Sequence, residues 1–252
     1  KIVGQSHHYQ SQAFAGFVSH SIELNSKPGE KLIINPGLRL EVFEQERVDR
    51  LTGATYQDKT TAVLLPSIGF NKQIGNSNFF GGIHRGFTPP SSGSIKILNF
   101  GDNESSGGLE LKAETSWNKE LGYRTSSDFL ESGDFNLELA LFHVDIDNMV
   151  AAGRSIDFKN LGKIQSMGLE ISSDIKSSLR LPTIHFNYSY LMTKVVDAQI
   201  MSNIDSDYFG LHPSANCLEI SYDDNGVPID CKKDISGNEL PYSPNHTLMI
   251  GL

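Results

Sequence analysis

The sequence predicts an all-β fold: a transmembrane up-and-down antiparallel β-barrel, of which this chain supplies about nine strands. Three observations predict it. Apolar and polar residues alternate with a period of two through most of the chain, as they do in strands whose two faces meet different surroundings. Short and long connections follow one another in strict succession, and the charged residues of the strands gather on one face.

The composition limits the class of protein. The chain has 252 residues, with 30 Asp and Glu against 21 Lys and Arg, and the formal net charge of −9 disfavours a nucleic-acid partner. The mean hydropathy is −0.27 and there is no run of 18 apolar residues, which excludes membrane-spanning helices. Spanning strands remain possible because half of the residues of a barrel strand are polar.

The alternation defines the strands in order along the chain. In LIINPGLRLEV, Leu32, Leu38 and Leu40 share one face with the other apolar residues, opposite Arg39 and Glu41. The segment FNLELALFHVDI keeps the pattern as far as Leu141 and then changes face at Phe142, which either a β-bulge or a different register at this point would explain. Nine strands are expected, at about 11–24, 31–47, 61–71, 78–87, 113–125, 134–148, 163–176, 181–197 and 244–252.

The connections between these strands are of two kinds. The short ones (NSKPGE, KQIGNS, SSDFLESG and SSLR) alternate with long external loops at 48–60, 88–112, 149–162 and 198–243. Outer-membrane barrels have this arrangement, with short periplasmic turns and longer external loops. A soluble sandwich has no reason to keep its long loops at one end, and a loop of about forty residues without periodicity is unusual in a compact soluble domain.

The two faces can be assigned to lipid and to lumen. The stretch TSWNKELGYR places Trp117, Lys119, Leu121 and Tyr123 on one face, which we expect to meet lipid. An Arg or Lys that faces lipid at the midplane costs about 2–4 kcal/mol, so the more highly charged face should line the lumen or meet a plug. We expect these residues to form salt bridges there, and not a catalytic cluster, because the sequence around them shows no nucleophile or metal motif. The lumen-facing set is Arg39, Glu41, Glu120, Arg124, Glu170 and Asp174.

Several ordered motifs resemble one known family. GGIHRGFTPP (81–90), LKAETSWNKELGYR (111–124) and LELALFHVDIDNMV (137–150) are similar to segments of TonB-dependent outer-membrane receptors, of the ferric-citrate type of iron-chelate receptor. Further similar pieces are FAGFVSHSIELN with KLIINPGLRLE, NLGKIQSMGLEISSDI and NELPYSPNHTLMIGL. The chain departs from the family at Ala113-Glu114, where a Pro-Glu pair is common. The resemblance implies that 1–252 is the central part of a 22-stranded barrel, whose plug domain, energy-coupling box and terminal strands lie outside this sequence.

The resemblance also implies a function. It is TonB-dependent active uptake of a ferric chelate, of the citrate or siderophore type, by a multi-pass protein of the outer membrane of a Gram-negative bacterium. The expected partners are the chelate, the TonB–ExbB–ExbD energy complex acting through the plug, and outer-membrane lipid including lipopolysaccharide. We expect no enzyme activity and no cofactor beyond the transported chelate. The alternatives are a passive porin or adhesin barrel, a TonB-dependent receptor for a nutrient other than iron, and a secreted glycan-binding β-protein.

Candidate ligand-binding residues lie at the upper strand ends and in the loops. Arg85 is a natural partner for the carboxylates of an anionic chelate, and His84 precedes it. The alternative is a structural motif, in which the neighbouring glycines allow a close approach of strands. The full set of candidates is His84, Arg85, Arg154, Tyr208 and His212, with Lys232 and Lys233 also plausible.

The two cysteines and one pair of adjacent histidines could have other chemistry. Cys217 and Cys231 are too few for a zinc site and are either free thiols or a disulfide at the base of the last long loop. In an oxidising compartment such a disulfide would contribute roughly 3 kcal/mol, and the outer-membrane location favours it. Side chains of the adjacent pair His7-His8 would point apart, so no metal site is predicted.

Overall fold

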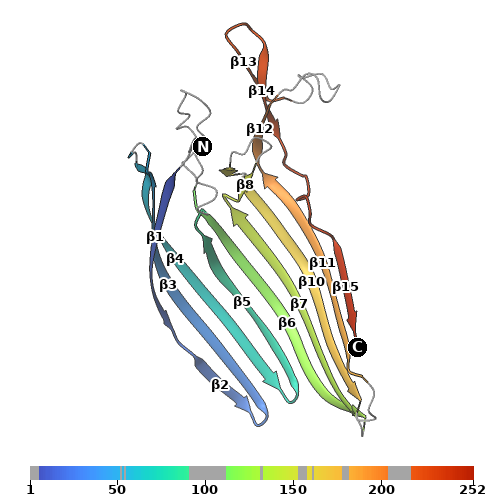
Figure 1. Ribbon diagram of the computed structural model, residues 1–252. Coiled ribbons are helices and arrows are strands. Elements are labelled where there is room, and N and C mark those ends of the chain that lie inside the picture. The colour runs from blue at the N-terminus through green and yellow to red at the C-terminus, as the bar shows by residue number, and fades with distance from the viewer. Residues whose placement is uncertain are drawn as a thin grey trace.

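The computed structural model describes residues 6–51, 53, 55–90, 112–130, 133–152, 158–160, 162–177, 182–203 and 217–252. Every regular element in these ranges is a β-strand, in one large antiparallel sheet and two small ones (Figure 1). Among the described residues, no helix has the length and apolar character needed to cross a membrane.

The large sheet is an up-and-down meander, which confirms the predicted all-β antiparallel fold. Its strand order is β1-β3-β4-β5-β6-β7-β10-β11-β15, with β2 also paired to β3, so neighbours in space follow one another along the wall. β1 and β2 together correspond to the first predicted strand. The strands are β1 (His7–Ser19), β2 (Ile22–Lys27), β3 (Glu30–Asp49), β4 (Thr55–Ile74), β5 (Ser77–Thr88), β6 (Glu114–Leu130), β7 (Gly133–Asp147), β10 (Lys163–Ser177), β11 (Ile184–Asp197) and β15 (His246–Gly251).

The first strand is interrupted opposite a proline. Pairing of β1 with β3 stops at Ser19 opposite Gly37 and resumes in β2 at Ile22 opposite Ile34. Pro36 lies between these two positions of β3 and has no N–H to donate to the ladder, although its carbonyl still accepts from the His20 N–H at 3.0 Å. β1 and β2 therefore pair with β3 in the same register across the interruption, as two separate strands at the edge of the sheet.

Consecutive strands of the sheet are joined alternately at its lower and its upper end (Figure 1). Gly75-Asn76 joins β4 to β5 in two residues, and Gly75 has a φ of 56° that only glycine adopts at low cost. The predicted long loop 48–60 is wrong, because β3 continues to Asp49 and β4 begins at Thr55, in register opposite Val48. Alternation cannot reveal these strand ends, because beyond the lipid both of their faces can be polar.

Two of the other predicted loops carry small sheets of their own. Within 149–162, β8 (Val150–Ala152) pairs with β9 (Phe158–Asn160). Within 198–243, β14 (Pro228–Asp234) pairs with both β12 (Gln199–Asn203) and β13 (Glu219–Tyr222). The three-stranded sheet extends above the wall at the end of β11 (Figure 1). Most of the predicted loop 88–112 lies outside the described residues.

A small core attaches this extension to the wall. Ile164 of β10, Val195 of β11 and Ala198 are buried together and pack against Ile235 and Leu240 from the segment after β14. Backbone hydrogen bonds run alongside, from the Val195 N–H to the Asn238 carbonyl at 2.8 Å and from the Ile235 N–H to the Ala198 carbonyl at 3.0 Å. The three-stranded sheet, which we call the upper sheet, is therefore packed onto and hydrogen-bonded to the upper end of the large sheet, which we call the wall.

The expected bulge in β7 is absent. Pairing with β6 and β10 runs without a shift from Phe135 to Ile146, so Phe142 and Val144 lie on the face opposite Leu141. The upper part of β7 reverses its polarity: the ring of Phe142 lies over Gly168 on one face, while His143 and Asp145 project from the other. The apolar residues do change from one face of β7 to the other at Phe142, but the strand itself stays regular.

Candidate functional site on the concave face

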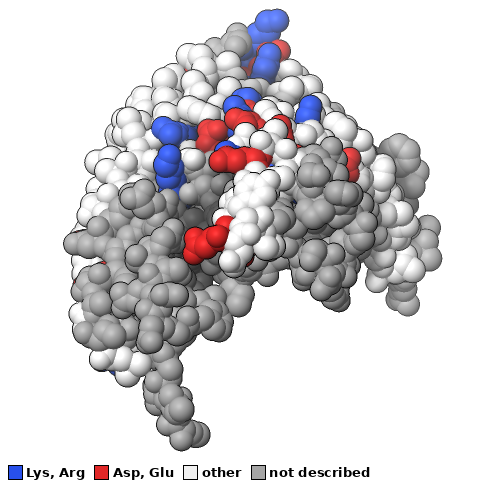
Figure 2. All heavy atoms as spheres, turned by 90° about the horizontal axis from the view of Figure 1, so that it is seen from above, with Lys and Arg blue, Asp and Glu red and all other residues white. Residues whose placement is uncertain are grey.

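The sheet curves into an arch with a hollow on one side when viewed from its upper end (Figure 2). Acidic and basic side chains gather near the middle of the arch, and acidic ones are visible in the hollow. The strand registers place all six predicted lumen-facing residues on one face, which we call the polar face. Trp117, Leu121 and Tyr123 lie on the opposite, apolar face, with Leu141 and Leu169 in register beside Leu121.

Most charges on the polar face are paired with a near neighbour. Arg39 Nε lies 3.0 Å from Glu41 Oε2, two residues along the same strand. Arg124 Nε donates to Glu138 Oε2 at 2.7 Å across the β6–β7 pair. On the next strand pair, Asp174 Oδ1 lies 2.6 Å from His185 Nδ1. These pairs let a strand carry charge on a face that also contains aliphatic side chains.

Glu138 and His185 were not among the predicted site residues. Each lies directly opposite its partner, Arg124 with Glu138 and Asp174 with His185. Alternation in one strand shows which face a residue takes, but not which residue of the next strand lies opposite it. The predicted strand limits would have placed Arg124 opposite Phe135, because they do not include the register shift between Ser127 and Leu130.

Two carboxylates of the polar face, those of Glu120 and Glu170, form no ion pair within the described part of the chain. They line a hollow of about 260 Å³ at the middle of the wall, together with His84, Asn118 and the ring of Phe142. Two acidic groups on a concave surface favour a cationic partner, since neither forms an ion pair with a basic side chain of the described wall. Among the described residues there is no group of three potential ligands that could hold a metal ion.

The strand register separates the predicted ligand pair His84-Arg85. His84 lies opposite Asn118 and lines the polar hollow, whereas Arg85 lies opposite Trp117 on the apolar face. A ligand inside the concave face could therefore contact His84 but not Arg85. The register places the two side chains on opposite faces, because adjacent strand residues alternate, and the predicted ligand-binding role of each stays a prediction.

The structural alternative for this motif has direct support. A Cβ at Gly82 would lie 3.0 Å from the Ile68 carbonyl oxygen, and one at Gly81 would lie 2.7 Å from the Glu120 carbonyl oxygen. A Cβ at Gly86 would lie 2.5 Å from Ser116 Oγ. The glycines are thus required by the close approach of β4 and β6 to β5.

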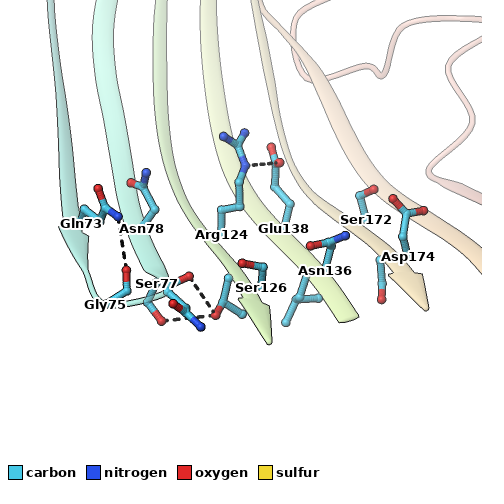
Figure 3. Close-up of a pocket in the computed structure, with 14 residues that line it drawn as sticks. Gln73, Gly75, Ser77, Asn78, Arg124, Ser126, Asn136, Glu138, Ser172 and Asp174 are labelled. Carbon is cyan, nitrogen blue, oxygen red and sulfur yellow. Dashed lines mark hydrogen bonds and ion pairs between the residues drawn. The ribbon is translucent and has the colours of Figure 1, made fainter. Parts of the chain in front are cut away.

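A second hollow, of about 530 Å³, lies at the lower end of the wall (Figure 3). Amide and hydroxyl side chains of β4, β5, β6, β7 and β10 line it, and Figure 3 shows the Arg124–Glu138 pair on its upper side. Asn78 Oδ1 is buried here without a hydrogen-bond partner in the described structure.

The remaining candidates lie in the upper loops. Arg154, Tyr208 and His212 lie outside the described residues, so their predicted role is not tested. Lys232 is on β14, with its Nζ 3.9 Å from Glu219 Oε2. His8 Nδ1 lies 3.1 Å from an Arg50 guanidinium nitrogen.

Cys217 and Cys231 form a disulfide between the start of the β13 segment and β14. The Cys231 side chain is 1% exposed. At the other end of β14, Asp234 accepts hydrogen bonds from the side chain and backbone of Ser236, and the side-chain hydrogen bond is the larger cause of a lowered pKa for Asp234.

Residues 3–252 match the TonB dependent receptor-like, beta-barrel family. The match covers nearly the whole chain, and the chain therefore belongs to this family, which consists of outer-membrane receptors and not of enzymes. No curated protein matches the sequence.

Solved structures of iron receptors have the same fold. The ferric-catecholate import receptor Fiu from Escherichia coli K12 matches with a TM-score of 0.59 and 18% identity over 98% of this chain and 32% of its own. The FrpB iron transporter from Neisseria meningitidis matches with a TM-score of 0.51 and 14% identity, over 81% of this chain and 32% of its own. The chain thus spans about a third of the length of these receptors, and at such identities the likeness shows the fold alone.

Proposed function

We propose that the chain is part of the barrel wall of an outer-membrane receptor that takes up a ferric chelate, of the citrate or siderophore type, with energy supplied through TonB, ExbB and ExbD. The family match along the wall supports this proposal, as do the two iron receptors with the same fold. The transport step needs no covalent chemistry. The wall provides an apolar surface for lipid and a polar surface for the plug and the passing cargo.

The observation that carries the proposal is the pattern of unpaired acceptors on the polar face. Glu120 and Glu170 form no ion pair in the described structure, and Asn78 Oδ1 has no donor. An open aqueous pore would leave such groups to water, whereas a plug would bring donors and cations to them. We propose that the carboxylates of Glu120 and Glu170 contact the plug, and that His84 lies beside this contact.

The test uses the full-length receptor in a strain that lacks its own copy, supplied with one ferric chelate at a time as the sole iron source. Glu120→Gln with Glu170→Gln removes both charges and keeps the size of the side chains. We expect binding of the chelate at the cell surface to remain within about twofold, and uptake to fall roughly tenfold, because a lost charge-assisted contact is worth about 1.5–3 kcal/mol. The result on different chelates also identifies the cargo class.

Glu23→Gln is the matched control. Glu23 lies on the same face but already pairs with Lys31 at 2.7 Å in the wall, so uptake should be unchanged. If neither citrate nor any siderophore supports growth through the parent receptor, the iron proposal fails. A steady open conductance of the purified parent in planar bilayers would instead favour the passive porin.

A further inference from the structure

The hairpin of β8 and β9 is too short to be stable by itself. Its pairing extends over three residues of each strand, from Val150 opposite Asn160 to Ala152 opposite Phe158. An isolated two-stranded hairpin is at best marginally stable in water. Contacts with the upper ends of β6, β7 and β10, which we call the rim, must therefore hold it in place.

The hairpin leaves the course of the wall at two bends that lie side by side. Asn148, directly after β7, has a φ of 58°, and Gly162, directly before β10, has a φ of 106°. Asparagine and glycine are the residues that take such left-handed conformations at the lowest cost. The Met149 N–H donates to the Gly162 carbonyl at 3.3 Å, which joins the two bends. The direction of the hairpin is thus set at the rim.

Glu114 holds the beginning of β8. Its Oε1 accepts a hydrogen bond from the Val150 N–H at 2.6 Å. Ser116, opposite Ile146, lies on the polar face, and the alternation along β6 places Glu114 on this face as well. The hairpin therefore begins on the concave side of the rim, which a ligand arriving from outside has to pass.

Asn160 holds the end of β9. Its side-chain oxygen accepts from the Lys112 N–H at 2.8 Å, and its side-chain nitrogen donates to the Lys112 carbonyl at 2.9 Å. An amide side chain that binds both backbone groups of one residue replaces the pairing of a neighbouring strand. The same nitrogen donates to the Asn148 carbonyl at 2.6 Å, directly at the bend. Asn160 thereby joins the hairpin to the segment before β6 and to the end of β7.

We propose that Glu114 and Asn160 are positioning residues for the binding of the chelate. Their hydrogen bonds, which we call the brace, keep the β8–β9 hairpin in one place at the rim before a ligand arrives. Without the brace the hairpin would become ordered only in the complex, and this loss of entropy would weaken binding. The steps after binding do not depend on it. The inference rests on the proposed function, but the order of the hairpin can be measured without any ligand.

The first measurement separates binding from transport. Cells that produce the full-length receptor are given iron as ferric citrate or as a ferric catecholate, each over a range of concentrations. For Glu114→Ala and for Asn160→Ala we expect the Kd of the bound chelate to rise about fivefold, with the maximal uptake rate within about twofold of the parent. Glu114→Gln keeps the acceptor oxygen and should return the Kd to within about twofold of the parent.

The second measurement is hydrogen exchange of the purified receptor without ligand, read by mass spectrometry. In both alanine variants the amides of β8 and β9 should exchange faster, while those of β6 and β7 keep their parental rates. Glu30→Ala is the matched control, because Glu30 is a carboxylate at the lower end of β3, where it pairs with Lys72 at 3.8 Å. Neither measurement should change in this variant.

A parental Kd in both alanine variants would overturn the positioning role, whatever happens to the exchange rates. An equal loss of affinity in Glu114→Gln would overturn it too, because the charge and not the hydrogen bond would then be needed. Unchanged exchange in both alanine variants would show that the brace does not order the hairpin. If the parent binds neither chelate, the proposed function fails and the binding role with it, whereas the exchange rates still decide on the brace.

Discussion

Three aromatic rings of the wall lie over glycines of the adjacent strand. Phe70 covers Gly81 on the apolar face, while Phe80 covers Gly122 and Phe142 covers Gly168 on the polar face. A ring over a glycine shields the exposed backbone of a strand and fixes the register of two strands, since a shift of one residue would place the ring on a side chain.

Gly81→Ala should therefore destabilise the barrel. Its Cβ would lie 2.7 Å from the Glu120 carbonyl oxygen, which is backbone and cannot rotate away, and 2.9 Å from the Phe70 ring. Overpacking of this kind costs about 1–3 kcal/mol, seen as a lower urea midpoint of the full-length receptor in detergent. Gly16→Ala is the control, because nothing lies within 4 Å of its Cβ and the change should be neutral or slightly stabilising. Equal midpoints for both variants would contradict this account of Gly81.

The alternation of side chains predicted the face of each charged residue but not its partner. Arg124 and Asp174 were expected on the polar side, yet their partners Glu138 and His185 depend on the pairing of strands. In the same way, Lys119 was expected on the apolar face without any reason for a charge there. The reason is Asp145 on the next strand, and only the register brings the two together.

At the scale of elements, the sequence predicted strands well wherever one face meets lipid. The central strands β5, β6, β7 and β10 begin and end within a few residues of their predicted limits, with the lower end of β6 running furthest beyond. The upper ends of β3 and β4 and the strands β12 to β14 were predicted as loops. Above the membrane both faces of a strand meet water, so the period-two pattern on which the prediction depended is lost there.

The upper sheet should keep its attachment to the wall when its disulfide is removed. Cys217→Ser with Cys231→Ser opens a loop of about fifteen residues, which the chain-entropy estimate places at roughly 3 kcal/mol. The effect should be confined to β13 and β14, because the core of Ile164, Val195 and Leu240 holds the base of the sheet independently. Hydrogen exchange of the full-length receptor should accelerate in β13 and β14 and stay unchanged in β10 and β11. Faster exchange throughout β10 and β11 would show that the disulfide also stabilises the wall.

The whole molecule is a curved sheet with two unlike surfaces. Leu121, Leu141 and Leu248 on the apolar face are each more than half exposed, and the face continues across all the long strands. A continuous apolar surface of this extent is unstable in water and marks contact with lipid or protein. On the other face, the paired charges and the two polar hollows are compatible with an enclosed, hydrated interior.

Spin labels on neighbouring residues of one strand should therefore report opposite environments. In the full-length receptor in a bilayer, a label at Ile171 projects from the apolar face and one at Ser172 from the polar face. Leu38, Leu169 and Tyr188 should behave as Ile171 does, being readily relaxed by oxygen, which concentrates in lipid, and weakly by a water-soluble nickel complex. Ser172 should show weak relaxation by oxygen because the wall separates it from lipid. If the nickel complex relaxes labels at Leu169 and Ser172 equally, both faces meet water, and a lipid-embedded wall is not tenable.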